Sequence, residues 1–369
     1  MNNKKIKILF LCHGNICRSP LAEYIMNDKI KKAELAGFVH ASSAALHTDE
    51  LGNGVYPPAK KLLNTVGINC DGHHARLATK SEYDSFDYII CMDEANVCDA
   101  KRLFGGDPNE KIFKLLEFLN LSETADRDVA DPWYTRDFEK SWMQIEAGCK
   151  ALLYKIAQSL FPHSDEPVSN ETMREVDAYT IKNFVSSEEL MHRAGEAIFE
   201  NIKDKITAPV AIVCGKGNNA GDGLVTALCL SRARIPCNVI LISETLSDDS
   251  LYYLDWCVNA GVPIAPYVSG ASFDGFGTII DCIFGTGFSG EPREPYASAI
   301  RSINDSNAFI ISADINSGLN GDTGLGDLYV KSDLTISIGS YKKGHFIGNA
   351  PLAIKEKVNV DIGIVVKNR

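Results

Sequence analysis

Residues 12–19 read Cys-His-Gly-Asn-Ile-Cys-Arg-Ser and stand between a predicted strand and a predicted helix. The strand is the apolar run at residues 6–11, and apolar residues at helical spacing follow over residues 20–26. Successive backbone N–H groups in such a loop converge on an anion, and the positive end of the following helix strengthens their field. The stretch therefore predicts a cradle for a phosphoryl group at the carboxyl end of the first strand.

Two side chains of this loop carry the predicted chemistry. The positive field favours the thiolate form of Cys12, which is then a nucleophile for phosphorus. Arg18 offers two N–H donors in the forked geometry that suits a phosphate. The structural alternative is that Cys12 is a small buried apolar residue, as most free cysteines are. A cysteine followed by five residues and then Arg-Ser, in a loop of this type, favours the catalytic interpretation.

Phosphoryl transfer to a thiolate also requires an acid that protonates the departing oxygen. Asp131 is our prediction for this acid, and then for the base that activates the hydrolytic water. Trp133 and Tyr134 follow closely and would offer flat walls to an aromatic substrate. Taken alone, an Asp-Pro pair is better explained as an ordinary turn initiator.

The loop at residues 12–19, the strand at residues 88–93 and the late Asp131-Pro-Trp-Tyr together resemble the low molecular weight protein tyrosine phosphatases over residues 4–158. The resemblance implies that Cys12 is the nucleophile, Arg18 the phosphate clamp and Asp131 the general acid, with no cofactor. It also implies a set of residues that support the loop, namely His13, Gly14, Asn15, Ile16, Cys17, Ser19, Ser43 and His73. Among them, Ser19 would donate to the Cys12 sulfur, and Cys17 would either trap an oxidised Cys12 as a disulfide or simply pack.

The substrate of this half stays open at the level of sequence. In some family members the loop after the second strand carries an aromatic residue that helps to wall the substrate. Here that stretch, residues 46–51, reads Leu-His-Thr-Asp-Glu-Leu. Phosphotyrosine in a protein is the default expectation, and phosphoarginine or a small phosphoester are the alternatives.

The chain changes character at residues 159–167, which contain two prolines among polar residues. We expect this stretch to link a domain at residues 1–158 to a second domain at residues 168–369, since 369 residues exceed one ordinary core. Strands alternate with helices in both halves. This predicts two doubly wound α/β domains, a small four-stranded parallel sheet followed by a Rossmann-like three-layer α/β/α domain.

A glycine-rich loop opens the chemistry of the second half. An apolar strand at residues 208–214 leads into Gly-Lys-Gly-Asn-Asn-Ala-Gly-Asp-Gly at residues 215–223, and a helix is expected at residues 224–232. Strand, glycine-rich loop and helix are typical of dinucleotide binding, and the fingerprint G-x-G-x-x-A begins at Gly215. With Glu244 at the end of the next strand, an NAD-dependent oxidoreductase is one alternative.

The polarity of this loop argues against hydride transfer. Asn218, Asn219 and Asp222 crowd the turn, and a carboxylate repels a pyrophosphate unless a cation intervenes. Oxygen-bearing side chains suit a hard cation or a polar ligand. Two later strands each place a carboxylate, Asp281 or Asp314, near their carboxyl ends, where open α/β sheets bind ligands. For either aspartate the structural alternative is a turn cap.

Three motifs in order, GNNAGDG, Ile280-Asp281 leading to GTGFSGE, and Asp314-Ile-Asn-Ser-Gly-Leu, resemble the NAD(P)H-hydrate epimerases over residues 168–369. The resemblance implies hydrated NADH or NADPH (NADHX or NADPHX) as substrate, Asp314 as the acid–base group, and a separate dehydratase downstream. It implies a potassium ion held by Asn219, Asp281 and Ser317. It also implies that two stretches bind the nucleotide, namely Asn218, Asn219, Ala220, Gly221 and Asp222, and Gly285, Thr286, Gly287, Phe288, Ser289, Gly290 and Glu291.

Two positions depart from the epimerase pattern. Ala220 replaces the usual glycine and would add a Cβ where the backbone approaches the ligand. Asn316 replaces the expected proline after Ile315 and would loosen a fixed turn. A non-catalytic dimerisation or nucleotide-sensing module is therefore a further alternative for this half.

The composition of the chain limits the kinds of binding partner and compartment that we expect. A net charge of −11 argues against nucleic acid or an anionic membrane as a partner. Eleven cysteines without paired C-x-x-C spacing indicate neither a disulfide framework nor a zinc site, and they favour the cytoplasm. No stretch approaches the about 18 apolar residues of a membrane span. The epimerase resemblance also suggests a homodimer.

Overall fold

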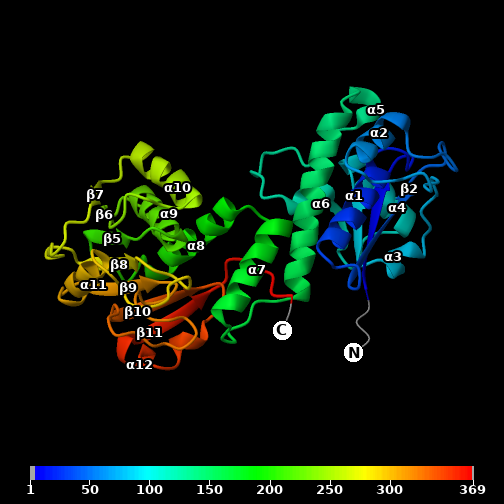
Figure 1. The fold of residues 1–369 in the computed structure, drawn as a ribbon. Helices are drawn as coiled ribbons and strands as arrows, with labels where there is room; N and C mark the ends of the chain where they lie inside the picture. Colours follow the sequence, from blue (N-terminus) through cyan, green and yellow to red (C-terminus); the bar gives the residue numbers. More distant parts are fainter. Residues whose placement is uncertain (1–4, 368–369) are drawn as a thin grey trace. The chain divides into compact units, whose positions relative to one another are not determined.

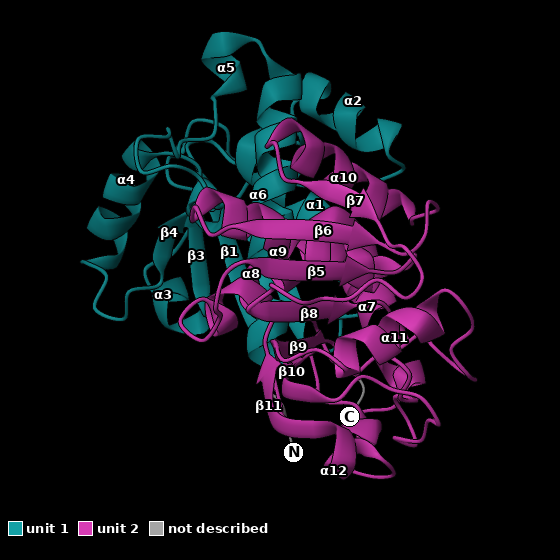
Figure 2. Cartoon of the chain, turned by 90° about the vertical axis from the view of Figure 1, so that its left-hand side faces the viewer, with its two compact units in different colours: residues 1–160 teal, residues 161–369 magenta. Residues whose placement is uncertain are grey.

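The computed structural model describes residues 5–367, and its contacts divide the chain into two compact units (Figure 2). The division falls between Leu160 and Phe161. The predicted linker at residues 159–167 begins inside a helix, because α6 (Phe138–Leu160) continues to Leu160. Each unit is built on its own parallel sheet.

The first unit has a four-stranded parallel sheet in the order β2-β1-β3-β4, in agreement with the predicted fold. Its strands are β1 (Ile6–Cys12), β2 (Val39–Ala45), β3 (Tyr88–Cys91) and β4 (Ile112–Lys114). Its helices are α1 (Arg18–Lys32), α2 (Pro57–Thr65), α3 (Glu82–Ser85), α4 (Glu94–Phe104), α5 (Pro132–Thr135) and α6, with a 3-10 turn η1 (Leu115–Phe118) after β4.

The core of this unit forms around β1, which lies between β2 and β3. Residues 8–11 are fully buried, which is why β1 reads as an unbroken apolar run. Burying one such side chain, for example Phe10, contributes roughly 1.5–3 kcal/mol. Gly148 lets α6 approach η1 closely, since a Cβ there would lie 2.6 Å from Leu115 Cγ. The packed sheet thereby fixes the direction in which the loop after β1 leaves.

The second unit has a seven-stranded parallel sheet in the order β11-β10-β9-β8-β5-β6-β7 (Figure 1). Its strands are β5 (Val210–Cys214), β6 (Cys237–Leu241), β7 (Ile264–Pro266), β8 (Thr278–Cys282), β9 (Phe309–Ala313), β10 (Ser332–Ile338) and β11 (Ile354–Val360). Its helices are α7 (Asn170–Asn183), α8 (Ser187–Ile202), α9 (Asn218–Arg232), α10 (Asp248–Asn259), α11 (Tyr296–Asn304) and α12 (Ala350–Ala353), with a 3-10 turn η2 (Lys343–His345).

Helices cover both faces of this sheet. α11 packs on the face that carries Ala211 and Val213, and α9 lies on the opposite face against Ile212 and Cys282. The chain builds β5, β6 and β7 toward one edge and then crosses back to start β8 beside β5. The loops after β5 and β8 therefore separate at a topological switch point, where open α/β sheets bind ligands.

The glycine-rich stretch is more helical than predicted. α9 begins at Asn218, not at residue 224, so most of the expected loop forms its first turns. Close packing is the physical reason. A Cβ at Gly221 would lie 2.2 Å from Met191 Sδ, and one at Gly223 would lie 2.8 Å from Cys282 Sγ. These glycines bring α9 against α8 and β8.

In the part of the chain that the structure describes, no helix has the length and apolar character to span a membrane.

Candidate active sites

The loop between β1 and α1 is held by a buried hydrogen-bond network centred on Asn15. Asn15 adopts φ 56°, a left-handed conformation that asparagine tolerates better than most residues. Its Nδ2 donates to Ser19 Oγ (2.9 Å) and to Ser43 Oγ (2.7 Å), and its Oδ1 accepts from the Arg76 backbone N–H (3.2 Å). The backbone carbonyl of Asn15 lies 2.7 Å from His73 Nε2. The three predicted support residues Asn15, Ser43 and His73 therefore lie together.

Cys12 lies at the start of this loop, buried at 4% exposure, with its Sγ 3.0 Å from Ser19 Oγ. A hydroxyl at that distance can donate to a thiolate, as predicted for Ser19. Ile16 and Cys17 are buried and pack against Ala75. Burial, with the charge of Cys12 adding to it, raises the pKa of the Cys17 thiol to about 12. Cys17 is therefore a neutral thiol near Cys12.

Arg18 begins α1 and is 3% exposed, with two carboxylates as partners. Its Nη1 donates to Asp93 Oδ2 (2.5 Å) and its Nη2 donates to Asp131 Oδ2 (2.7 Å). Burial opposes the charge on Arg18, but the surrounding anionic groups raise its pKa above the ordinary value. Sequence reasoning missed Asp93 as a site residue. The feature that could have indicated it is its position just after β3, because β3 pairs in parallel with β1 and both strands present their carboxyl ends at the same edge.

Asp131 caps the short helix α5, because its Oδ1 accepts from the Trp133 N–H (2.9 Å) while Oδ2 faces Arg18. Trp133 and Tyr134 are 43% and 82% exposed, so both predicted wall residues stand at the surface close to Asp131. The Trp133 ring meets Tyr56 edge-on, with centroids 5.6 Å apart.

The loop after β2 lacks the aromatic residue that some family members carry there. It places the imidazole ring of His47 beside the phosphate loop. The His47 ring stacks on the ring of His13, with centroids 4.1 Å apart. His13 Nε2 lies 3.0 Å from Asp49 Oδ2, and His47 Nε2 lies 2.9 Å from Asp99 Oδ2. Gly14 permits this loop to lie close, since a Cβ there would be 2.9 Å from Glu50 Cγ.

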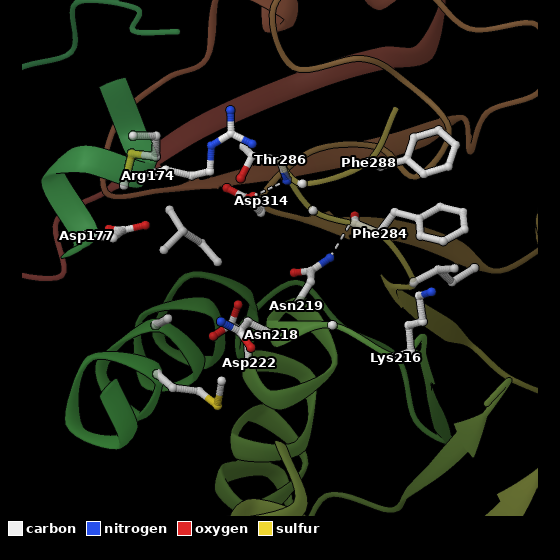
Figure 3. Close-up of a pocket in the computed structure, with 18 of the residues that line it drawn as sticks. Arg174, Asp177, Lys216, Asn218, Asn219, Asp222, Phe284, Thr286, Phe288 and Asp314 are labelled. Atoms are coloured by element: carbon white, nitrogen blue, oxygen red, sulfur yellow. Dashed lines mark hydrogen bonds between the residues drawn. The ribbon is translucent and has the colours of Figure 1, made fainter. Parts of the chain in front are cut away.

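The second unit contains a cavity of about 700 Å³ at the switch point of its sheet (Figure 3). Its volume lies within the roughly 300–1,000 Å³ of small-molecule sites. The cavity is bordered by the start of α9, the loop after β8, the end of β9, and helices α7 and α8. Of the predicted nucleotide-binding residues it is lined by Asn218, Asn219, Asp222, Gly285, Thr286, Gly287, Phe288, Ser289 and Glu291.

Asp314 lies at the end of β9, in a left-handed conformation with φ 64°, and faces this cavity. Its Oδ2 accepts from the Thr286 backbone N–H (3.1 Å), and its Oδ1 accepts from Lys342 Nζ, a lysine that is 1% exposed. Burial opposes ionisation, but Lys342 holds the pKa of Asp314 below its ordinary range. Asp314 is therefore a carboxylate. Sequence reasoning missed Lys342, whose signal was its position just after the apolar strand β10.

Two other carboxyl groups of the cavity behave in the opposite way. Burial raises the pKa of Asp177 on α7 to about 7. Burial, together with the charge of Asp314, raises the pKa of Asp222 well above its ordinary value. Figure 3 shows Asp177, Asp222 and Asp314 around the same space. Asp177 was not among the predicted site residues, since it lies in a helix far from the loops in sequence.

Asn219, Asp281 and Ser317, the predicted cation ligands, lie together beside the cavity. Asn219 Nδ2 donates to the carbonyl of Phe284 (2.9 Å), and its buried Oδ1 has no hydrogen-bond partner within residues 5–367. The fully buried Asp281 accepts at Oδ1 from Ser317 Oγ (2.5 Å) and at Oδ2 from the Ser317 N–H (2.9 Å). Burial raises the pKa of Asp281, and these donors oppose the rise.

Residues 7–161 match the family model described as low molecular weight phosphotyrosine protein phosphatase. Over 151 residues the chain is 39% identical to the low molecular weight protein-tyrosine-phosphatase YfkJ of Bacillus subtilis, a match that covers 41% of this chain and 96% of that relative. The first unit belongs to the low molecular weight protein-tyrosine-phosphatase family. The crystal structure of YfkJ from Bacillus subtilis aligns with a TM-score of 0.41 and 38% identity, over 42% of this chain and 97% of that one.

Residues 187–344 match the family model described as YjeF-related protein N-terminus. Over 200 residues the chain is 31% identical to the bifunctional NAD(P)H-hydrate repair enzyme Nnr of Coxiella burnetii, a match that covers 53% of this chain. It covers 41% of that relative, so the chain spans less than half of its length. The chain thus joins a phosphatase unit to a YjeF-related unit, the fusion that its motifs predicted.

The two departures in the YjeF-related unit have structural explanations. Ala220 is fully buried and does not line the cavity, and neither do Gly221 and Gly290. Asn316 does not loosen its turn as predicted. Its Nδ2 donates to the Val330 carbonyl (2.9 Å), and its Oδ1 accepts from Thr335 Oγ1 (2.6 Å). The prediction was wrong because a buried amide can fix a turn through its hydrogen bonds.

Proposed function

We propose that the chain is a bifunctional enzyme, with a cysteine-dependent phosphatase in its first unit and an NAD(P)H-hydrate epimerase in its second. The phosphatase proposal rests on one observation above the others. Arg18, Asp131 and Cys12 are held at one loop, with the arginine fixed between two carboxylates and the sulfur within reach of a hydroxyl.

In the proposed reaction, the Cys12 thiolate attacks phosphorus while Asp131 gives its proton to the departing oxygen. Asp131 then accepts a proton from the water that hydrolyses the cysteinyl phosphate. The phosphate dianion competes with Asp131 for Arg18 Nη2. Substrate binding would therefore release Asp131 from its ion pair with Arg18.

We propose phosphotyrosine in a protein as the substrate, because Trp133 and Tyr134 present exposed aromatic rings beside Asp131. The full chain should be assayed with a phosphotyrosine peptide, phosphoarginine and a small alkyl phosphoester, with Cys12→Ser as the inactive control. Preferred turnover of the peptide supports the proposal. Preferred turnover of either other compound reassigns the substrate, and turnover by Cys12→Ser contradicts the mechanism.

For the second unit we propose interconversion of the S and R forms of NADHX and NADPHX, which a separate dehydratase would then restore to the cofactor. The supporting observation is that both predicted nucleotide stretches and Asp314 line one cavity at the switch point. One purified epimer should be mixed with the full chain and the other epimer followed by chromatography. Binding without conversion favours the sensing-module alternative, and hydride transfer to a keto substrate favours an oxidoreductase.

We propose that Asn219, Asp281 and Ser317 hold a potassium ion in this unit. The unpartnered buried oxygen of Asn219 supports this, because a buried acceptor without a donor is costly unless a ligand satisfies it. Oxygen donors of this kind suit a hard cation, whose role would be to fix the loop after β8 and to balance the Asp281 charge. Cytoplasmic location and a homodimer remain predictions from the sequence.

A further inference from the structure

Asp177 is a half-buried residue that lines the cavity, and the proposed function of the second unit assigns it no role. It projects from α7 toward the space that Asp314 faces (Figure 3). Its Oδ1 is buried and has no hydrogen-bond partner in the described structure. A buried polar atom without a partner in a ligand cavity indicates a group that the ligand completes.

The charges around Asp177 come from three other elements. Asp314 follows β9 and is paired with Lys342, which precedes η2, and Asp222 lies in the second turn of α9. Arg174, one turn earlier on α7, also lines the cavity. Among the described residues no lysine or arginine is ion-paired with Asp177. Burial favours its neutral form and outweighs the opposing charge of Lys342, which is ion-paired with Asp314.

Asp177 and Asp314 therefore differ in proton affinity although they line one cavity, since the pKa of Asp177 is raised and that of Asp314 is lowered. When the surroundings of two carboxyl groups raise the pKa of one and lower that of the other, the first can serve as a proton donor and the second as a proton acceptor. We propose that Asp177 is a catalytic general acid of the second unit and that Asp314 is the base which acts with it. The inference rests on the proposed epimerase function.

The proposed epimerisation takes place on the hydrated nicotinamide ring, in which the hydroxyl-bearing carbon is bonded to the ring nitrogen. The C–O bond breaks with its electron pair on oxygen, and the Asp177 proton converts the departing hydroxide into water. The lone pair of the ring nitrogen forms a C=N bond, which leaves a cationic ring. Water then attacks the opposite face, the C=N pair returns to nitrogen, and the excess proton passes to Asp314. The opposite configuration results, and proton return through solvent restores both carboxyl groups.

The test compares Asp177→Asn with Glu175→Gln in the full chain. Glu175 is an exposed residue on the same helix and serves as the matched control. We expect Asp177→Asn to lower kcat for epimerisation about 10²–10⁴-fold, the range of general acid catalysis. The Kd for a non-reactive dinucleotide, NADH, should change less than about threefold, and Glu175→Gln should match the wild type.

The pH profile and an isotope label separate catalysis from a structural role. The wild type should lose activity as the pH rises through about 7, where Asp177 ionises, and Asp177→Asn should lack this decline. In H₂¹⁸O, the product epimer should gain label faster than the uncatalysed control. Wild-type epimerisation with an unaffected Asp177→Asn variant overturns the inference alone. Wild-type protein without any epimerisation overturns the proposed function, and an unlabelled product overturns the water-loss step.

Discussion

Replacing Asn15 tests whether one buried amide shapes the phosphate loop. Asn15 is fully buried, and its side chain makes three hydrogen bonds, to Ser19, Ser43 and the Arg76 N–H. At about 0.5–1.5 kcal/mol for each bond, Asn15→Gly should destabilise the first unit by roughly 1.5–4.5 kcal/mol.

The backbone adds a second contribution that separates glycine from alanine. At φ 56° an alanine bears a strain of about 1–2 kcal/mol, whereas glycine bears none and loses about 0.5–1 kcal/mol more chain entropy. Asn15→Ala should therefore be less stable than Asn15→Gly, by up to about 1.5 kcal/mol. Both variants should lower kcat/KM for p-nitrophenyl phosphate at least about tenfold. A loss of about 1.36 kcal/mol of transition-state stabilisation, caused by a less ordered phosphate loop, is enough for that factor.

Urea unfolding of the full chain measures the stability change. The chain has three tryptophans, two of them, Trp133 and Trp142, in the first unit. Replacement of the half-exposed Trp256 by phenylalanine therefore leaves a fluorescence signal from the first unit only. Unchanged stability in both variants, or an alanine variant more stable than the glycine variant, would refute this account of the loop.

Four further changes test individual residues of the two units. Asp131→Asn should lower kcat about 10²–10⁴-fold for phenyl phosphate and much less for p-nitrophenyl phosphate, whose leaving group needs little protonation; equal losses would remove Asp131 as the acid. Asp93→Asn should raise KM for both esters more than it lowers kcat, because Arg18 loses a charged partner; unchanged kinetics would make Asp93 only a helix cap. Asn316→Pro, which restores the residue of the epimerase pattern, should destabilise the second unit by about 1–3 kcal/mol in urea, because buried partners lose their bonds; a stabilised variant would contradict this. Burial raises the pKa of Asp177 from 3.8 to about 7, so the folded state holds this proton where the unfolded state releases it, and stability should fall as pH rises from about 4 to 7. Asp177→Asn should flatten that part of the urea stability profile, and an unchanged slope would count against the raised pKa.

The sequence by itself determined the features that depend on near neighbours. Cys12 and Arg18 belong to one strand–loop–helix segment, so their spacing already implied a shared anion site. Alternating apolar strands and helices implied parallel sheets, because burial on both faces imposes that pattern. The motifs that end β5, β8 and β9 likewise predicted where the second cavity forms, since parallel strands present their carboxyl ends at one edge.

Only the tertiary structure decided which distant groups complete the sites. Asp93, Lys342 and Asp177 reach them from separate elements, and a place after a strand or within a helix does not by itself distinguish such residues from ordinary caps or surface charges. The early start of α9 depended on the helix and strand packed against Gly221 and Gly223. The clamping role of Asn316 depended on partners from β10 and the segment before it. In each case the deciding energy comes from burial and hydrogen bonding between residues far apart in sequence, which exist only once the chain has folded.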